Sequence, residues 1–202
     1  MKDKGSKNRL EEPIAEYGPY SYADYLSWDL DEMVEIIKGR LFKMHAAPKR
    51  IHQKVSLYIA SELFQFLKGK TCEVYEAPFD VRLPKKSTRN EDIFTVVQPD
   101  ICVICDPGKL DEAGCLGPPD LIIEILSKGN NKKELLYKYE VYLESGVKEY
   151  WIIHPEEQTL LIYSLQDGKY VPSRLFTSGE TVHSNAIEGF SLDLGLLFEV
   201  ME

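Results

Sequence analysis

Three short, almost entirely apolar runs lie in the middle of the chain, and they predict its core. Two of them, Ile101–Cys105 and Leu121–Leu126, have the length of a strand and are rich in β-branched residues, and Tyr150–Ile153 is the third. Unbroken apolar runs of this kind are typical of strands that are buried on both faces of a sheet. A helical pattern over about 131–144, which Gly146 ends, separates the second run from the third.

The flanking segments show helical or alternating patterns. A long helix is predicted over about 48–68, because apolar residues recur on one stripe at helical spacing: Ile51, Val55, Tyr58, Ile59, Leu63, Phe64 and Leu67. The remaining elements are expected as a short helix over 20–28 capped by Ser21, a hairpin over 35–44 around Gly39, strands over 72–75, 79–83, 159–164 and 170–176, and a terminal strand and helix. Strands joined by a helical crossover predict a mixed α/β fold, with a central sheet flanked by helices.

Composition limits the class of protein. The chain has 202 residues, of which 44% are hydrophobic, and this suits a single domain. We expect a mobile, charged tail over 1–19 and one domain over 20–202, with its core at about 48–155. No apolar run approaches the roughly 20 residues that span a bilayer, and the first residues lack the apolar segment of a signal peptide. The four cysteines show no framework spacing, so we expect a reduced, cytoplasmic protein.

One acid interrupts the second apolar run. Glu124 lies inside the sequence LIIEIL, and Asp100 precedes the neighbouring apolar run. A carboxylate on a central strand costs several kcal/mol to desolvate unless another group pairs with it. Two acids on adjacent strands therefore suggest a shared Mg²⁺ or Mn²⁺, since hard oxygen ligands suit these ions and leave positions for water and phosphate. The plain alternatives are a strand-entry turn for Asp100 and a solvent-facing acid on an edge strand for Glu124.

A cation follows these acids on the predicted helix. Lys138 lies four residues after Glu134 and four before Tyr142, on one helix face. An ammonium group near a metal could position the attacking water or stabilise charge that grows on a phosphate. Spacing alone favours an ordinary solvated lysine paired with Glu134.

The order and spacing of these segments resemble a known family. The chain is similar to the PD-(D/E)XK nuclease superfamily, and within it to the Uma-two family of restriction-endonuclease-like proteins. The matching segments span about residues 20–198: YSYADYLSW, VEIIKGRLFKM, His52 on the long helix, VQPDICVI, PPDLIIEILS and KYEVYLESGVKEYWIIHP. The resemblance implies a restriction-endonuclease-like core with an N-terminal hairpin and a C-terminal β extension.

The resemblance also implies roles for particular residues. The superfamily's lysine would stand two places after Glu124, where this chain has Leu126, and the Lys138-x-x-x-Tyr142 pattern of the Uma-two branch takes its place. The resemblance therefore implies that Lys138 is catalytic. Glu134 matches an acid usual four residues before that lysine. Glu35 matches a hairpin glutamate near the site, although a solvent-facing hairpin acid fits its position equally well. For His52, a hydrogen bond within the core is favoured over direct chemistry.

The sequence therefore predicts a metal-dependent endonuclease that cleaves nucleic acid, with DNA as the expected substrate. Asp100 and Glu124 would hold Mg²⁺ or Mn²⁺, with the carbonyl of Ile125 as a further ligand. The net charge of −9 favours an alternative: a weak or inactive nuclease-fold module that binds nucleic acid or protein. A protein-interaction domain that forms a homodimer also stays open.

Three further features of the sequence are interpreted without a catalytic role. Asp120 is expected to have a capping or loop role. A zinc site at Cys102-x-x-Cys105 is disfavoured, because the pair has no partner motif. The polar, cationic loop 127–133 is the best local candidate for contacting phosphate, with a solvated loop as the plain alternative.

Overall fold

The structure is a computed structural model of the whole chain. It describes residues 18–29, 33–43, 49–127 and 132–200. The tail predicted over 1–19 lies outside these ranges except for its last two residues.

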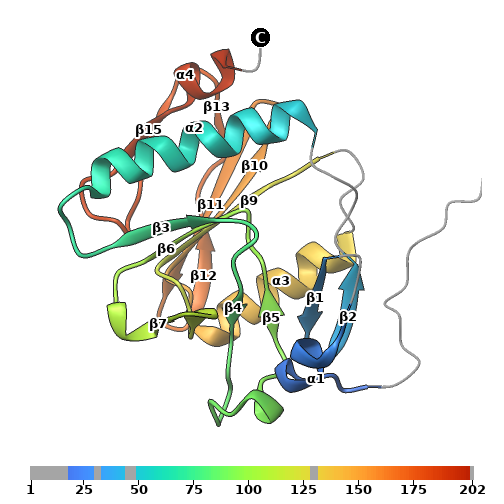
Figure 1. Cartoon of the computed structure of the whole chain (residues 1–202). Helices are drawn as coiled ribbons and strands as arrows, with labels where there is room; N and C mark the ends of the chain where they lie inside the picture. The colour runs from blue at the N-terminus through green and yellow to red at the C-terminus, as the bar shows by residue number, and fades with distance from the viewer. Residues whose placement is uncertain (1–17, 30–32, 44–48, 128–131, 201–202) are drawn as a thin grey trace, which may run out of the picture.

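The larger sheet is built around the predicted apolar strands. Its strand order is β12-β11-β10-β9-β6-β3, and β13 pairs with β11. The bounds are Glu73–Glu76 (β3), Ile101–Ile104 (β6), Leu121–Ile125 (β9), Glu149–His154 (β10), Thr159–Gln166 (β11), Lys169–Pro172 (β12) and Phe176–Thr177 (β13). Strand β9 runs parallel to β10 and antiparallel to β6. Helix α3 (Lys132–Ser145) connects β9 to β10 (Figure 1), so the prediction of a mixed sheet with a helical crossover is confirmed.

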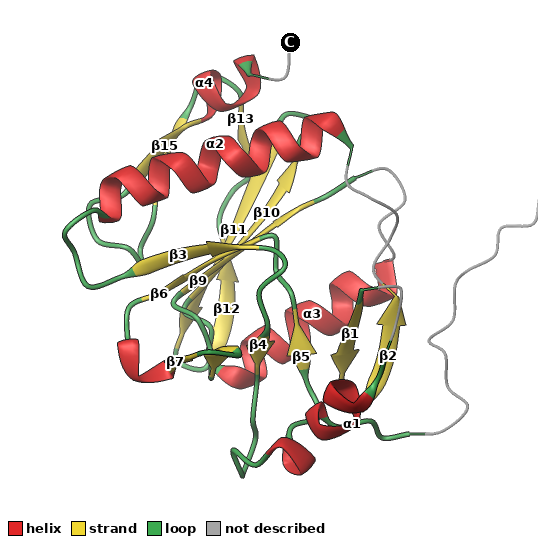
Figure 2. Cartoon of the chain, viewed as in Figure 1, coloured by secondary structure: helices red, strands yellow, loops and turns green. Residues whose placement is uncertain are grey.

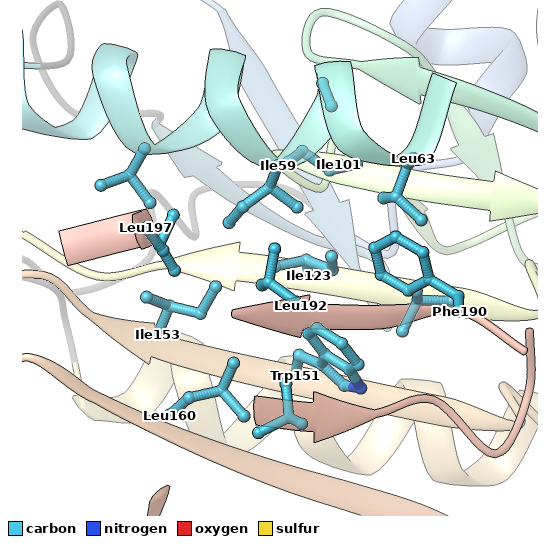
Figure 3. Close-up of a cluster of buried hydrophobic side chains, with 14 of the residues drawn as sticks. Ile59, Leu63, Ile101, Ile123, Trp151, Ile153, Leu160, Phe190, Leu192 and Leu197 are labelled. Carbon is cyan, nitrogen blue, oxygen red and sulfur yellow. The ribbon is translucent and has the colours of Figure 1, made fainter. Parts of the chain in front are cut away.

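Helix α2 (Arg50–Leu67) covers one face of this sheet (Figure 2). Figure 3 shows Ile59 and Leu63 of the helix above Ile123 and Trp151 of the strands, within one buried cluster. Phe64 was predicted on the same stripe, but it is 65% exposed. That part of the prediction is wrong because an α-helix turns about 100° per residue, so the residue after Leu63 points away from the sheet.

The other face of the sheet packs against α3 and a second, smaller sheet. The smaller sheet has the order β2-β1-β5-β4-β8-β7. Its strands are Val34–Ile37 (β1), Arg40–Lys43 (β2), Val81–Arg82 (β4), Val96–Val97 (β5), Leu110–Asp111 (β7) and Gly114–Leu116 (β8). The β1–β2 hairpin turns at Gly39, with a positive φ of 75°, as predicted. Ile37 and Phe42 of this hairpin share a core cluster with Val141 and Tyr142 of α3 and with Ile122 of β9. The hairpin is thereby held beside α3 and the centre of the larger sheet.

Short elements complete the fold. They are α1 (Tyr22–Ser27), the 3₁₀ turns η1 (Asn90–Asp92) and η2 (Pro107–Lys109), the strands β14 (Thr181–His183) and β15 (Ser191–Asp193), and α4 (Leu194–Glu199). Ser21 caps α1 through a capping box with Asp24, as the sequence predicted. Within the described ranges, no helix combines the length and the apolar character needed to cross a membrane.

A disulfide joins two strands of the larger sheet. Glu73 of β3 faces Ile104 of β6, and the next step of this register brings Cys72 opposite Cys105, with their Cα atoms 3.8 Å apart. The prediction that all cysteines are reduced is therefore wrong for this pair. The sequence could not show the pairing, because 33 positions separate the two residues. Cys102 and Cys115 are free and buried.

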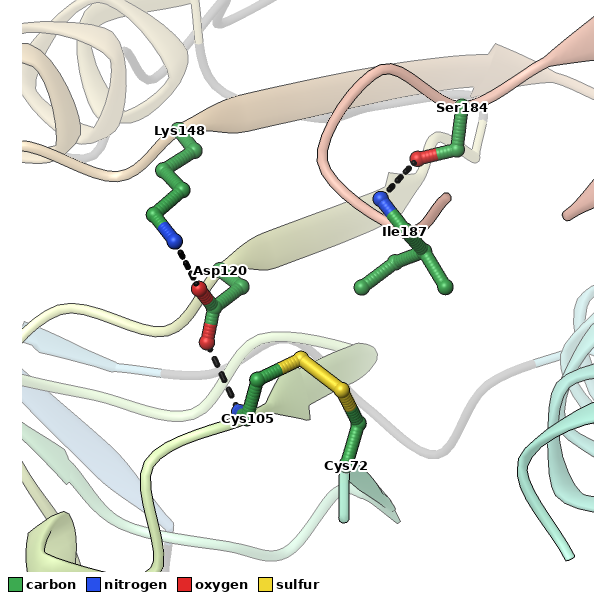
Figure 4. Close-up of a disulfide and its surroundings, with 6 residues drawn as sticks. All are labelled: Cys72, Cys105, Asp120, Lys148, Ser184 and Ile187. Carbon is green, nitrogen blue, oxygen red and sulfur yellow. Dashed lines mark hydrogen bonds and ion pairs between the residues drawn. A yellow bond between two sulfur atoms is a disulfide. The ribbon is translucent and has the colours of Figure 1, made fainter. Parts of the chain in front are cut away.

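Asp120 connects this disulfide to β10. One carboxylate oxygen, Oδ2, accepts a hydrogen bond of 2.7 Å from the backbone N–H of Cys105. The other oxygen, Oδ1, lies 2.6 Å from Nζ of Lys148 (Figure 4). Asp120 thus ties together a loop and two strands, in agreement with the loop role expected for it.

The disulfide should stabilise the protein mainly by restricting the unfolded chain. For the separation of 33 positions, loop closure predicts a contribution of about 3–4 kcal/mol. We expect Cys72→Ser to lower the free energy of unfolding in urea by about this amount. Reductant should lower the stability of the wild-type protein equally and leave that of Cys72→Ser unchanged. Equal unfolding midpoints for oxidised and reduced wild-type protein would show that the bond contributes nothing.

Candidate active site

The register between β6 and β9 places two acids side by side. Ile101 of β6 faces Ile123 of β9. One further step of this antiparallel register brings Asp100 across from Glu124. Residues directly opposite in such a ladder project from the same face of a sheet. The backbone N–H of Ile125 also donates a 2.7 Å hydrogen bond to Oδ2 of Asp100, which fixes the carboxylate against the end of β9.

Helix α3 covers Glu124 with two hydrogen-bond donors. Lys138 and Tyr142 are one turn apart, so they project from the same side of the helix. Nζ of Lys138 lies 3.0 Å from Oε1 of Glu124, and the Tyr142 hydroxyl donates to the same oxygen at 2.8 Å. Within the described part of the chain, no donor reaches Oε2 of Glu124. Glu124 therefore keeps one carboxylate oxygen for a further ligand.

Lys138 is buried between two carboxylates. Its Nζ also lies 3.0 Å from Oε1 of Glu35, on the β1–β2 hairpin. The side chains of Lys138, Glu35 and Glu124 are only 4%, 1% and 8% exposed. Glu35 also accepts a 2.7 Å hydrogen bond from the backbone N–H of Gln98. The solvated alternatives for Lys138 and Glu35 are therefore wrong, and both side chains belong to the cluster around Glu124.

The electrostatics of this cluster favour a cation. The pKa of Glu124 is raised to about 8, mainly by burial: the charge of Lys138 acts against this rise, and the negative charges of Asp100 and Glu35 add to it. Burial and the charge of Glu124 hold the pKa of Tyr142 well above its ordinary value, so that its hydroxyl stays protonated and donates. Glu124 and Glu35 thus share one lysine, and the charge of Asp100 adds to the negative charge around Glu124.

His52 lies against Asp100, on the first turn of α2. Its Nε2 lies 3.2 Å from Oδ1 of Asp100, and its side chain is 13% exposed. Burial lowers the pKa of His52, but the hydrogen bond and charge of Asp100, the charge of Glu124 and a backbone hydrogen bond of Ile125 raise it, and the net direction is upward. A hydrogen bond within the core was favoured for His52, but its Nε2 instead contacts the candidate metal ligand Asp100.

Other candidates lie apart from this cluster or outside the described residues. Positions 128–131 of the cationic loop are outside the described ranges, and the described side chains of α3 begin after Glu134. Leu126 is buried and apolar. No zinc pair forms at Cys102-x-x-Cys105, because Cys105 is bonded to Cys72. Among the described residues, no group of three or more His, Cys, Asp and Glu side chains is arranged to hold a metal ion.

Two residues that hydrogen-bond to the acids of this cluster were not predicted as site residues. Tyr142 was predicted only as the last residue of the Lys138-x-x-x-Tyr142 pattern, with no role of its own, yet its hydroxyl donates a hydrogen bond to Glu124. The Lys138-x-x-x-Tyr142 spacing was the signal that could have identified it, since residues four apart on a helix share a face. The contribution of Gln98 is a backbone N–H, which no side-chain pattern can indicate.

Comparisons with known proteins identify the family and the fold of the chain. The family model described as "Uma2: Putative restriction endonuclease" matches residues 22–195. A crystal structure of "a putative nuclease belonging to DUF820 from Anabaena variabilis ATCC 29413" superposes with a TM-score of 0.70 at 19% sequence identity. The match covers 91% of this chain and 100% of the other. At this identity the likeness shows the fold. No curated protein matches the chain.

Glu124→Gln tests the electrostatic account in metal-free buffer. A folded-state pKa of about 8 means that the folded protein retains a proton which the unfolded chain loses near the ordinary glutamate value. The free energy of unfolding of the wild-type protein should therefore fall as the pH rises between about 5 and about 9. Glutamine does not titrate, so the variant should fold and gain stability relative to wild type across this window. Denaturant titrations at several pH values measure the difference, and a constant difference would contradict the raised pKa.

Proposed function

Because the chain belongs to the family described as "Uma2: Putative restriction endonuclease", we propose that it is a metal-dependent endonuclease that hydrolyses phosphodiester bonds, with DNA as its substrate. The observation that carries this proposal is the position of Lys138. Its ammonium group is buried 3.0 Å from Glu124 and 3.0 Å from Glu35, and Asp100 neighbours Glu124 in the strand register. Side chains of β1, β9 and α3 thus meet at Lys138, with Asp100 next to Glu124 in the strand register, and two acids and a lysine so placed suit metal-assisted hydrolysis of phosphodiesters.

The residues fit a divalent cation of the Mg²⁺ type. Asp100 and Glu124 supply hard oxygen donors, Oε2 of Glu124 accepts no hydrogen bond from a described residue, and the side chain of Asp100 is 20% exposed. The carbonyl of Ile125 would be a third ligand. Mg²⁺ is commonly held by one or two carboxylates together with water and phosphate oxygens, so a site with few protein ligands suits it. A bound Mg²⁺ or Mn²⁺ would polarise the phosphate and help to ionise the attacking water.

The chain's own groups would position the reactants and balance their charge. In the reaction, a water oxygen forms a bond to phosphorus while the bond from phosphorus to the leaving oxygen breaks, and that oxygen gains a proton. Glu35 and Glu124 fix the Lys138 ammonium at a buried point, where a positive charge can stabilise the negative charge that develops on the phosphate. Tyr142 occupies the same oxygen of Glu124 as Lys138, and this leaves the other oxygen for the cation.

Cleavage assays with Asp100→Ala test this function. We expect the purified wild-type protein to cleave plasmid or oligonucleotide DNA with Mg²⁺ or Mn²⁺, and Asp100→Ala to be inactive because it loses a metal ligand. Asp29→Ala removes an exposed aspartate outside the cluster and should retain full activity. DNA binding without cleavage in the wild-type protein would favour the alternative of an inactive nuclease-fold module, and cleavage by Asp100→Ala would contradict the proposed site.

Lys138→Met tests the lysine separately from the metal. It keeps the aliphatic stem and deletes the charge, so we expect cleavage to fall by a factor of about 100 or more, the scale of losing one preorganised stabilising group. Stability should also fall, by about 3–5 kcal/mol at most, because two buried carboxylates lose their counter-ion. Metal binding should persist, since both acids remain.

The control for this variant is Lys85→Met, which removes an exposed lysine that pairs with Glu144. Both variants should be assayed at a temperature where circular dichroism shows them to be folded. If folded Lys138→Met cleaves DNA at the wild-type rate, Lys138 has no catalytic role and its burial serves the structure alone.

A further inference from the structure

His52 makes a specific contact with one oxygen of a candidate metal ligand. It lies on the first turn of α2, at the end of the helix near β9, and its Nε2 reaches Oδ1 of Asp100 at 3.2 Å. An ionised carboxylate can only accept hydrogen bonds, so Nε2 must carry the hydrogen. The contact therefore fixes the protonation of one ring nitrogen and joins α2 to the start of β6.

The two oxygens of Asp100 are held by two different elements. Oδ1 is held by His52 from α2, and Oδ2 by the backbone N–H of Ile125 at the end of β9. A carboxylate with a donor on each oxygen cannot rotate about its terminal bond without losing both contacts. Each oxygen has two lone pairs, so each can still accept a cation while it keeps its hydrogen bond.

We propose that His52 is a positioning residue that orients the Asp100 carboxylate to bind the divalent cation. This inference rests on the proposed function, because it assumes that Asp100 is a metal ligand. Groups that hydrogen-bond to metal ligands fix their orientation, and loss of such a group typically costs about 10–100-fold in metal affinity. His52 acts through Asp100 and does not itself coordinate the cation.

The environment of the ring distinguishes this role from simple packing. Nδ1 of His52 is buried and has no hydrogen-bond partner among the described residues. The far side of the ring is therefore not anchored by a polar contact, and a side chain that served only packing would leave a buried polar atom at a cost. The contact between the N–H at Nε2 and Oδ1 of Asp100 offsets the cost of burying Nδ1 without a partner.

Three variants separate the N–H of His52 from its volume. His52→Leu fills a similar space without a donor, whereas His52→Gln can place an amide N–H near Oδ1 of Asp100. His183→Leu makes the same chemical change at an exposed position on β14, in a separate sheet. Mn²⁺ affinity is measured by isothermal titration calorimetry at one fixed pH, without DNA, and folding is checked by circular dichroism.

We expect His52→Leu to weaken Mn²⁺ binding about 10-fold or more, while His52→Gln stays within about three-fold of wild type and His183→Leu is unchanged. Unchanged or tighter Mn²⁺ binding by folded His52→Leu would overturn the inference. Binding by His52→Gln that is as weak as that of folded His52→Leu would also overturn it. If His52→Leu does not fold, His52→Gln is compared with wild type alone, and a loss of Mn²⁺ affinity of about 10-fold or more in folded His52→Gln would overturn the inference. If the wild-type protein itself binds no Mn²⁺, the proposed function fails instead.

Discussion

The burial of the Lys138 ammonium between Glu35 and Glu124 is the constraint on which this site depends. All three side chains are almost completely removed from solvent, and an unpaired charge at such a depth costs several kcal/mol. The buried Lys138 ammonium therefore requires its two acidic neighbours. Because these residues come from the hairpin, from β9 and from α3, the electrostatic requirement fixes how the hairpin and the helix sit against the central strand. Apolar residues of similar volume often replace a buried ion cluster without loss of stability, so the cost of burying these three points to function.

The two sheets supply the framework that makes this possible. The antiparallel register of β6 and β9 sets Asp100 beside Glu124, and the packing of α3 on the same face brings Lys138 and Tyr142 over Glu124. The opposite face of the sheet is filled by α2 and the C-terminal segment. The first turn of α2 lies close enough to Asp100 for His52 to reach it. Strand pairing and helix packing thus bring the charged side chains of the site together at one end of β9.

Much of this architecture could be predicted from the sequence, because periodicity encodes which faces are buried. The apolar runs defined β6, β9 and β10, and the acid inside LIIEIL marked Glu124 as anomalous. Contacts between distant segments could not be predicted from patterns. The Cys72–Cys105 bond depends on strand register, and the burial of Glu35 depends on where the hairpin packs. For Lys138, spacing alone favoured a solvated residue, and only the family resemblance gave the correct environment.

The central claim is that Asp100 and Glu124 bind one divalent cation at the end of β9. An anomalous difference map from a crystal grown with Mn²⁺ tests it most directly, because the scattering of manganese locates the ion independently of activity. Our account predicts one strong peak bounded by the carboxylates of Asp100 and Glu124 and the carbonyl of Ile125, with Lys138 still paired to Glu35. A peak at another place in the molecule, or no peak at these carboxylates under saturating Mn²⁺, would contradict it.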